Sequence, residues 1–185
     1  MFRTYRRLDD KLTQVYNIGT KWDNHWMNIA KVTAELSKDP STKVGATVAF
    51  NKRLLGAGFN GFPPQVEDRV DWYLDRPIKY SLTIHAEVNA IIEAYKNGHS
   101  EQLVGASLYC TLLPCSDCAK LVIAAGIKNV FWIDGASHIE DADSYYNTHS
   151  VHEQSFNVFN RGQVNVYLTE TYDSSSTQTE EVGTD

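Results

Sequence analysis

Two short motifs, separated by about thirty residues, constrain this chain more than any other feature. The first is His85-Ala86-Glu87 and the second is Pro114-Cys115-Ser116-Asp117-Cys118. One imidazole and two thiolates can hold Zn²⁺ tetrahedrally, and three protein ligands leave the fourth position for a water molecule. The fold must therefore bring His85, Cys115 and Cys118 together around one ion.

Glu87 has a different expected role from these three ligands. It lies two residues after His85, so its carboxylate should reach the water without binding the metal and should act as a proton shuttle. A His-x-Glu segment followed by Pro-Cys-x-x-Cys is the signature of zinc-dependent nucleobase deaminases. A structural zinc site is the competing interpretation, but such sites normally have four protein ligands. The chain offers no second Cys-x-x-Cys or His pair.

Length and composition predict one soluble domain. A chain of 185 residues is too short for two ordinary domains, and no stretch approaches the roughly 20 apolar residues of a membrane span. Residues 1–7 have no apolar run behind their positive charges, so they do not resemble a secretory signal. Three cysteines are an odd number and suit a reducing compartment and a metal. We expect a cytoplasmic protein without membrane contact.

The negative charge is concentrated in the last residues. Residues 170–185 carry five acidic residues and no Lys or Arg, whereas the rest of the chain holds all 17 basic and 18 of the 23 acidic residues. Polynucleotide binding usually requires a basic surface. The near-neutral body therefore favours a free nucleotide as substrate, with no nucleic acid expected as a partner.

Hydrophobic periodicity predicts alternating helices and strands. The expected helices cover 22–37, 86–95, 115–125 and 143–160, and the expected strands cover 44–50, 54–59, 106–112, 129–133 and 164–168. A long surface loop, with a short helix around 71–74, should fill 61–84. The pattern indicates an α/β fold with three layers, α-β-α, and a central mixed sheet of about five strands. We expect an N-terminal arm over 1–21, a catalytic domain over 22–169 and a mobile acidic Ser/Thr-rich tail over 170–185.

This order of elements suits the metal chemistry. His85 and Cys115 each begin a helix, so two helix N-termini can point at one ion, and their partial positive charge favours thiolate over thiol. Cys110 lies within an expected strand and is interpreted as a small core residue.

Beyond the metal motif, the chain resembles the deoxycytidylate (dCMP) deaminase family across about residues 22–168. The resemblance is carried by the segments SKDPSTKVGA at 37–46, GFNGFP at 58–63, HAEVNAI at 85–91, CAK at 118–120 and AGIK at 125–128. It implies a cytidine deaminase-like fold and hydrolytic deamination of dCMP to dUMP and ammonia. Such a reaction supplies the precursor of dTMP.

The resemblance also implies substrate contacts. Asn60 would bond the 3′-hydroxyl of the sugar, which suits an amide that donates and accepts. Lys43, or its neighbours Ser41 and Thr42, would meet the 5′-phosphate. The backbone of Ala86 and Leu112 would border the pyrimidine ring.

Regulation and assembly are further implications of the resemblance. Members of the family are typically homohexamers, activated by dCTP with Mg²⁺ and inhibited by dTTP, through a site near the Asn60-Gly61 loop. Gly61, Asp68 and Trp72 are the candidates to line that site. The insertion before His85 has no extra Cys or His, so one catalytic zinc per chain and no structural zinc are expected.

Two alternatives remain open from the sequence. The first is a deaminase of dCTP, free cytidine or a polynucleotide base. The second is a non-catalytic, zinc-stabilised interaction protein. Such a protein would be expected to lose the proton-shuttling carboxylate, yet Glu87 is present.

Overall fold

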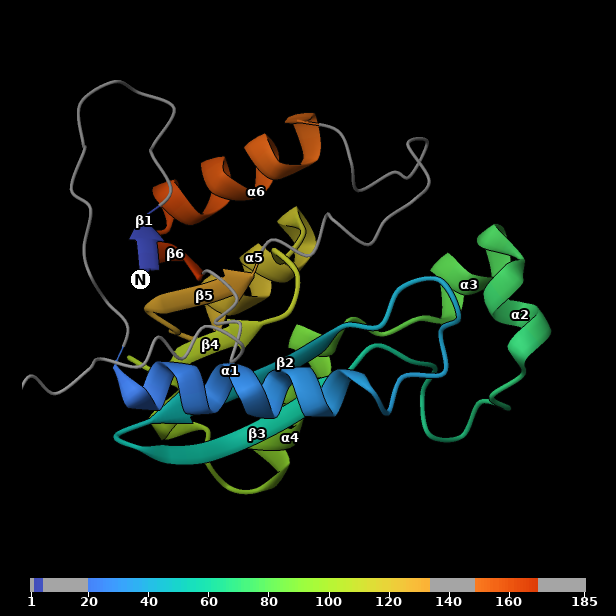
Figure 1. Cartoon of the computed structure of the whole chain (residues 1–185), viewed down its shortest axis with the longest axis horizontal. Coiled ribbons are helices and arrows are strands. Elements are labelled where there is room, and N and C mark those ends of the chain that lie inside the picture. The colour runs from blue at the N-terminus through green and yellow to red at the C-terminus, as the bar shows by residue number, and fades with distance from the viewer. Residues whose placement is uncertain (1, 5–19, 134–148, 170–185) are drawn as a thin grey trace, which may run out of the picture.

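The structure is a computed structural model, and it describes residues 2–4, 20–133 and 149–169 (Figure 1). The strands are β1 (Phe2–Thr4), β2 (Gly45–Phe50), β3 (Arg53–Phe59), β4 (Ser107–Cys110), β5 (Asn129–Ile133) and β6 (Asn165–Thr169). The helices are α1 (Lys21–Ala34), α2 (Val70–Leu74), α3 (Arg76–Leu82), α4 (Ala86–Lys96), α5 (Ser116–Ala124) and α6 (His149–Arg161), with a 3₁₀ turn at Glu101–Leu103.

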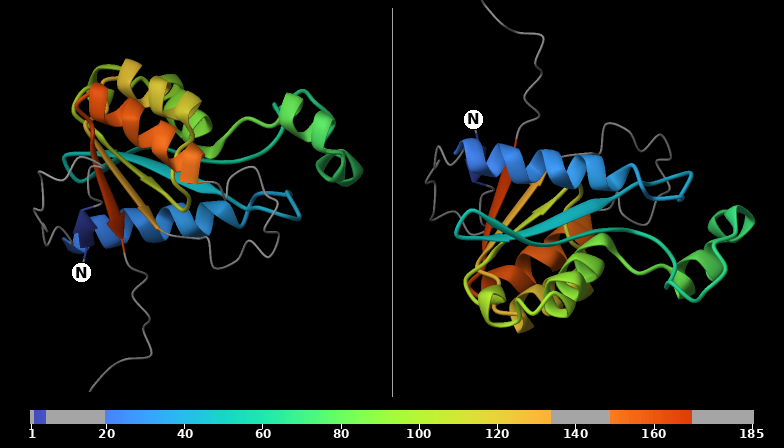
Figure 2. Two further views of the ribbon diagram at one scale, coloured as in Figure 1. Left: turned by 90° about the horizontal axis from the view of Figure 1, so that it is seen from above. Right: turned by 90° about the horizontal axis from the view of Figure 1, so that it is seen from below.

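The strands form one mixed sheet between two helical layers. Their order is β1-β6-β5-β4-β2-β3, with β4, β5 and β6 parallel to one another and the other neighbours antiparallel. Helix α1 covers one face of the sheet, and α4, α5 and α6 cover the other (Figure 2). The predicted three-layer fold with a mixed sheet is confirmed.

Alternating strand residues build a separate core on each face. Leu108 and Cys110 of β4 are fully buried in the cluster beneath α4, α5 and α6, whereas Tyr109 faces α1. The Tyr109 ring stacks on Phe131 of β5 with a centroid separation of 4.7 Å. This alternation follows from the two-residue period of a strand, and it confirms Cys110 as a core residue.

Helix α1 is tied to β4 through Asp23. The Asp23 carboxylate accepts a 2.6 Å bond from the Tyr109 hydroxyl and a 3.0 Å bond from the Thr20 amide. Thr20 and Asp23 thereby form a capping box, which satisfies amides at the helix start. Burial first, and then the bond to Asp23, raise the pKa of Tyr109 far above its usual range, so this hydroxyl stays a donor.

The β2–β3 hairpin and the packing of α4 against it fix the start of α4. Asn51 and Lys52 have φ of 48° and 62°, as a tight two-residue hairpin turn requires. A Cβ added to Gly58 would lie 2.4 Å from the Ala90 nitrogen and 2.7 Å from the Ala86 oxygen of α4. Glycine therefore allows the first turns of α4 to lie directly against β3.

The structure adds two elements that were not predicted. Strand β1 pairs with β6 at the sheet edge, within the predicted N-terminal arm. Helix α3 occupies part of the region interpreted as loop, because Pro77 stands in its first turn and Asp75 caps it by accepting from the Ile78 amide at 3.2 Å. Proline in a first turn starts a helix rather than breaking it.

Several predicted boundaries also shift. The helix predicted to run to residue 37 ends at Ala34, and the Ser37 hydroxyl instead donates to the Asn60 carbonyl at 2.8 Å. The short helix expected around 71–74 is present as α2. The first residues of the predicted 143–160 helix and the predicted tail over 170–185 lie outside the described residues.

Candidate metal centre

Two helix N-termini bring the three predicted ligands together. His85 is the N-cap residue of α4 and Cys115 is the N-cap residue of α5, each with extended backbone, while Cys118 lies in the first turn of α5. The His85 Nδ1 atom lies 3.5 Å from the Cys115 sulfur and 3.3 Å from the Cys118 sulfur. All three ligand atoms lie within 4.8 Å of one another.

These separations suit one tetrahedral zinc ion. Zn–S bonds of about 2.3 Å and Zn–N bonds of about 2.05 Å place tetrahedral N and S ligands about 3.6 Å apart. The observed N–S distances of 3.3 and 3.5 Å agree with that value. Within residues 20–133 and 149–169, the group has three members, so this part of the chain supplies no fourth His, Cys or carboxylate ligand to it.

The electrostatics of the cysteine pair favour a thiolate. The pKa of Cys115 is lowered to about 4, mainly because Cys118 donates to its sulfur, and His85 adds a second bond. The hydrogen bond that Cys118 donates to Cys115, together with burial, raises the pKa of Cys118. The bond to Cys115 also raises the pKa of His85, against the effect of burial. Since zinc binds thiolate rather than thiol, Cys115 is prepared as a ligand.

Glu87 lies beside this group without belonging to it. It stands in the first turn of α4, and its side chain is buried, with an exposed fraction of 4% for the residue. Burial raises the pKa of its carboxyl group, and the nearby His85 opposes the shift. A buried carboxyl whose pKa is raised above its usual value is suited to taking and returning a proton.

The end of β3 fixes the residue that precedes His85. The Gly61 amide donates to the Ile84 carbonyl at 3.1 Å, and the Ile84 amide donates back to the Gly61 carbonyl at 2.8 Å. The Asn89 side chain of α4 donates to the Phe59 carbonyl at 2.8 Å. Gly61 is a predicted residue of the effector site. Its two backbone bonds to Ile84 also help to position His85 in the metal centre.

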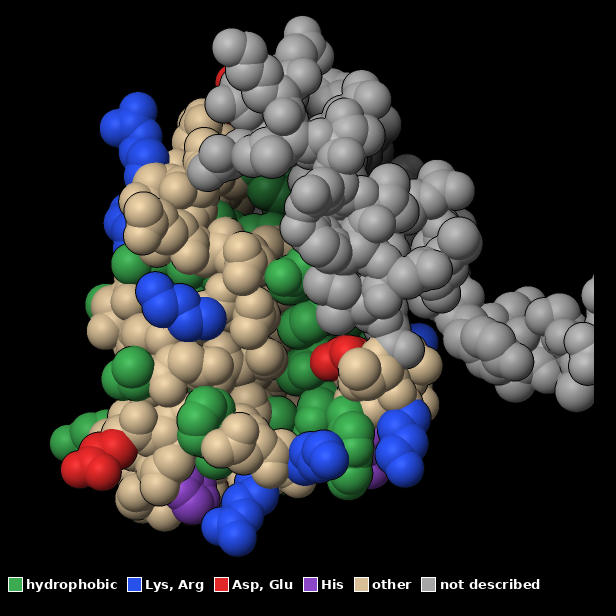
Figure 3. Space-filling model, turned by 90° about the vertical axis from the view of Figure 1, so that its left-hand side faces the viewer, with side chains coloured by type: hydrophobic (Ala, Val, Ile, Leu, Met, Phe, Trp, Pro, Cys, Tyr) green, Lys and Arg blue, Asp and Glu red, His purple; other side chains and the backbone are tan. Residues whose placement is uncertain are grey.

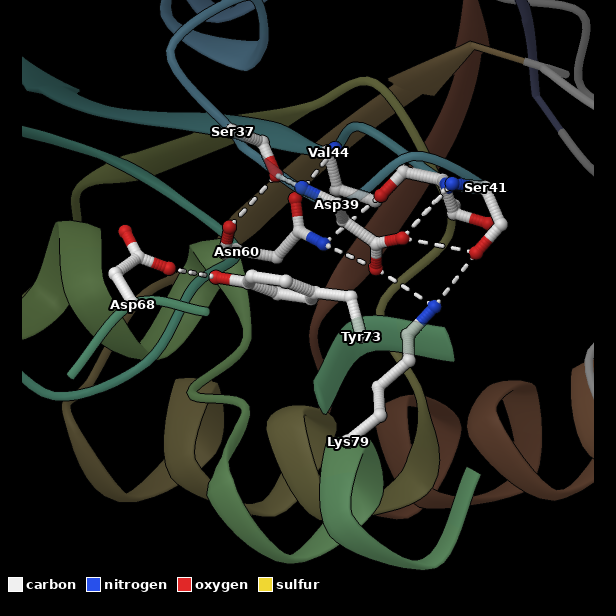
Figure 4. A network of polar contacts seen from close by, with 9 residues as sticks. Ser37, Asp39, Ser41, Val44, Asn60, Asp68, Tyr73 and Lys79 are labelled. Atoms are coloured by element: carbon white, nitrogen blue, oxygen red, sulfur yellow. Dashed lines mark hydrogen bonds and ion pairs between the residues drawn. The ribbon is translucent and has the colours of Figure 1, made fainter. Parts of the chain in front are cut away.

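Asn60 is buried, and its side-chain amide is hydrogen-bonded through both the oxygen and the nitrogen (Figure 4). Its Oδ1 accepts from the Val44 amide at 2.8 Å, and its Nδ2 donates to the Thr42 carbonyl at 2.9 Å and to Asp39 at 3.3 Å. Both Nδ2 protons thus have partners, and the remaining capacity is a lone pair on Oδ1. The predicted contact with the sugar would use that lone pair.

The two predicted phosphate contacts do not lie together. The Ser41 hydroxyl donates to Asp39 at 2.8 Å and accepts from Lys79 at 2.8 Å. Lys43 instead forms a 3.4 Å ion pair with Glu35 beyond the end of α1, and its side chain is 44% exposed. Ser41 faces the polar network around Asn60, whereas Lys43 is directed to the surface.

The remaining predicted site residues lie on several different elements. Ala86 is fully buried at the start of α4, and Leu112, just after β4, is partly buried against the main core. Asp68 accepts from the Tyr73 hydroxyl at 2.8 Å and forms a 3.0 Å ion pair with Lys38. Trp72 lies on α2, and the Arg69 guanidinium lies over its indole ring, 5.3 Å from the centroid of that ring.

Sequence reasoning missed Asp39 and Lys79. Asp39 precedes Pro-Ser-Thr, and an Asp that accepts from the amides two and three residues later is a recognisable turn signal. Lys79 has no such local signal, because its partners lie about forty residues earlier in the chain.

Known proteins share both the motif and the fold. The sequence profile of the family described as "Cytidine and deoxycytidylate deaminase zinc-binding region" matches residues 20–134, which is more than half of the chain. This chain belongs to that family. The match includes His85, Glu87, Cys115 and Cys118, so the predicted family and deaminase class are confirmed.

Individual relatives support the same family assignment. Human deoxycytidylate deaminase is 38% identical over 129 residues, which cover 65% of this chain and 69% of the human protein. The deoxycytidylate deaminase of Mycobacterium phage D29 is 32% identical over 60% of this chain and 93% of the phage protein. The crystal structure of dCMP deaminase from cyanophage S-TIM5 in apo form superposes with a TM-score of 0.61 at 26% identity, covering 83% of this chain and 98% of that one.

None of the helices within the described ranges has both the length and the apolar character that a bilayer crossing requires.

Proposed function

We propose that this chain is a dCMP deaminase, which hydrolyses the C4 amino group of dCMP to give dUMP and ammonia. The observation that carries the proposal is the convergence of His85, Cys115 and Cys118 beside the buried carboxyl of Glu87. The relatives named as deoxycytidylate deaminases support dCMP as the substrate. In a cell, the product would serve as a precursor of dTMP.

The donor set suits zinc, which would be held by the His85 Nδ1 atom and the two cysteine sulfurs. When bound, zinc lowers the pKa of a coordinated water towards about 7 and so supplies the nucleophile. Glu87 would take one proton from the attacking water and deliver it to N3 of the cytosine. It would then take the second proton from the hydroxyl group that has added to C4 and carry it to the departing amine, so that the C4–N bond breaks and ammonia leaves. Its burial keeps bulk water away from this proton path.

The substrate side would be formed by Asn60 and by the backbone beside the metal. Asn60 would accept from the sugar 3′-hydroxyl through its remaining lone pair, and the Ser41 side of the network would face the 5′-phosphate. The backbone of Ala86 and Leu112 would border the ring. We propose residues 22–169 as the catalytic domain.

A free nucleotide is preferred to a polynucleotide on the grounds of charge. On the side of the molecule drawn in Figure 3, Lys and Arg side chains lie apart from one another among other residue types. The described residues on that face offer no continuous basic track of the kind that follows a phosphate backbone.

Regulation and assembly complete the proposal. We propose a homohexamer that is regulated by dCTP with Mg²⁺ and by dTTP near Gly61, Asp68 and Trp72. Exposed apolar side chains on the helices, including Val32 at 72% and Tyr95 at 69%, would be covered by subunit contacts. The three free cysteines support a reducing compartment such as the cytoplasm.

The decisive experiment is ammonia release by the zinc-loaded chain with four substrates: dCMP, dCTP, cytidine and a single-stranded oligonucleotide. Metal content is measured on the same sample. We expect one zinc per chain and a kcat/KM for dCMP that exceeds the others by at least about 100-fold, since a polar site rejects analogues that leave its groups unpaired. If another substrate is preferred, that compound would take the place of dCMP in the proposal. Zinc binding without turnover of any of the four substrates would favour the alternative of a non-catalytic, zinc-stabilised interaction protein.

A further inference from the structure

We propose that Lys79 of α3 is a positioning residue for the nucleotide side of the site, acting through Asp39 and Ser41. The ion pair that it forms holds the loop of residues 37–44 and the side chain of Asn60 in place. The inference rests on the proposed function, because it assigns Lys79 to substrate binding rather than to zinc binding or proton transfer.

The first observation is the burial of this ion pair. The Lys79 ammonium lies 2.7 Å from Asp39 Oδ2, and the exposed fractions of the two side chains are 13% and 1%. Lys79 also donates to the Ser41 hydroxyl at 2.8 Å. Such a pair is stable only with good geometry and further hydrogen bonds, and loss of one partner leaves an uncompensated buried charge.

Asp39 distributes the effect of this ion pair to the loop. Its Oδ1 accepts from the Ser41 amide at 2.9 Å, the Ser41 hydroxyl at 2.8 Å and the Thr42 amide at 3.2 Å. Its Oδ2 accepts from Asn60 Nδ2 at 3.3 Å as well as from Lys79. The carboxylate that orders the loop is therefore neutralised by a cation from helix α3.

Asn60 extends the network towards the metal centre. It fixes the Val44 amide at 2.8 Å, and the next residue, Gly61, pairs with Ile84 directly before His85. The zinc ligands themselves stand on α4 and α5, whose helical bonds do not involve Lys79. Loss of Lys79 should therefore disturb the loop and Asn60 more than the metal centre.

Helix α3 does not depend on Lys79 alone for its attachment (Figure 4). The Tyr73 ring of the adjoining helix α2 stacks on Phe62 with a centroid separation of 4.1 Å, and its hydroxyl donates to Asp68. These contacts should keep the segment 61–84, the insertion before His85, attached when Lys79 is changed. Effects of the variant can then be assigned to the loop of residues 37–44.

The kinetic test compares Lys79→Met with wild type in the zinc-loaded full chain. We expect the KM for dCMP to rise by at least about 10-fold, while kcat stays within about 3-fold and zinc stays at one per chain. Lys79→Arg retains the charge and should keep most of the affinity. Arg69→Met, which breaks an exposed ion pair of the same insertion, is the control and should leave KM within about 2-fold. An unchanged KM in Lys79→Met, or a loss confined to kcat, would overturn the inference.

A second variant tests the same pair from the other side. Asp39→Asn keeps one oxygen that can accept from the Ser41 and Thr42 amides, but it removes the charge and replaces the oxygen that faces Lys79 with an NH₂ donor. It should raise the KM to a similar extent. The double variant should be no worse than the poorer single variant, because partners of one pair act as a unit. Additive losses in the double variant would contradict the pairing.

Hydrogen exchange separates this inference from the proposed function. In Lys79→Met, the amides of Ser41, Thr42 and Val44 should exchange at least about 10-fold faster, whereas amides of α5 should keep their rates. This readout does not depend on turnover of dCMP. Unchanged loop amides, or uniform acceleration throughout the chain, would contradict a local positioning role for Lys79.

Discussion

The side chains of the candidate metal centre stand in the first turns of two helices, whereas the network around Asn60 consists of loop residues bonded to one another. His85 and Cys115 are N-cap residues, with Glu87 and Cys118 in the following turns. At the second region, Asn60, Asp39 and Ser41 hold one another through side-chain bonds. The metal centre is thus positioned mainly by backbone, and the loop network mainly by side chains.

This difference predicts how each region responds to substitution. Truncating a residue of the metal centre should remove its chemistry and leave the helices in place, because their packing against the sheet does not depend on that side chain. Truncating a residue of the loop network should release its neighbours, because their buried polar groups lose partners.

The largest effect is expected from Cys115→Ala. Loss of one of three ligands should lower zinc affinity by more than the roughly 10–100-fold that removal of an outer-shell partner causes, and deamination should be lost with the metal. Circular dichroism should stay close to wild type, since α5 packs on the sheet through Ala119 and Val122. Metal analysis after dialysis checks this, and full zinc occupancy would refute the ligand assignment.

Glu87→Gln should separate proton transfer from metal binding. The amide has the size of the buried carboxyl but cannot carry the proton, so kcat should fall by about 10²–10⁴-fold while zinc stays bound. The control is the zinc content of the same sample. A metal-loaded variant with wild-type turnover would show that another group moves the proton.

Sequence reasoning found the first region because its signals are local. His-Ala-Glu and Pro-Cys-x-x-Cys each place functional side chains at a helix start, and the expected strand over Asn129–Ile133 has the bounds that the structure shows. The two strands on either side of Asn51 and the core position of Cys110 likewise follow from adjacent residues.

The second region depends on contacts between residues distant in the sequence. Nothing near Lys79 indicates that it meets Asp39, forty residues earlier, because an ion pair leaves no periodic pattern. Pro77 lies in the region predicted as a surface loop, although it stands in the first turn of α3. Strand β1, with three residues, is too short to show the alternation from which strands are predicted.

Asn60→Ala should test the loop network through stability. It would leave the Val44 amide without its acceptor and remove two bonds to Thr42 and Asp39, at a cost of about 2–3 kcal/mol. For a chain of this size, Tm should fall by roughly 4–12 °C, as measured by thermal denaturation with saturating zinc.

Asn89→Ala is the matched control for this variant. Its side chain makes one described bond, to the Phe59 carbonyl at 2.8 Å, and is partly buried. The fall in Tm should therefore be clearly smaller than for Asn60→Ala. Equal effects of the two substitutions would mean that Asn60 does not have a special role in holding the loop.

The smallest effect is expected from Arg69→Met, which separates burial from distance. The Arg69–Asp71 pair and the Lys79–Asp39 pair have the same N–O separation of 2.7 Å. The first pair, however, has side chains that are 47% and 60% exposed. Water already solvates both of its charges, and a Met side chain can keep apolar contact with the Trp72 ring that the guanidinium covers, so little is lost when the cation is removed. Tm should change by less than about 1 °C, and the same should hold in about 0.5 M salt, where screening weakens exposed pairs further. If Lys79→Met is measured alongside, an equal fall in Tm for the two variants would mean that contact distance, rather than burial, determines how much each ion pair contributes to stability.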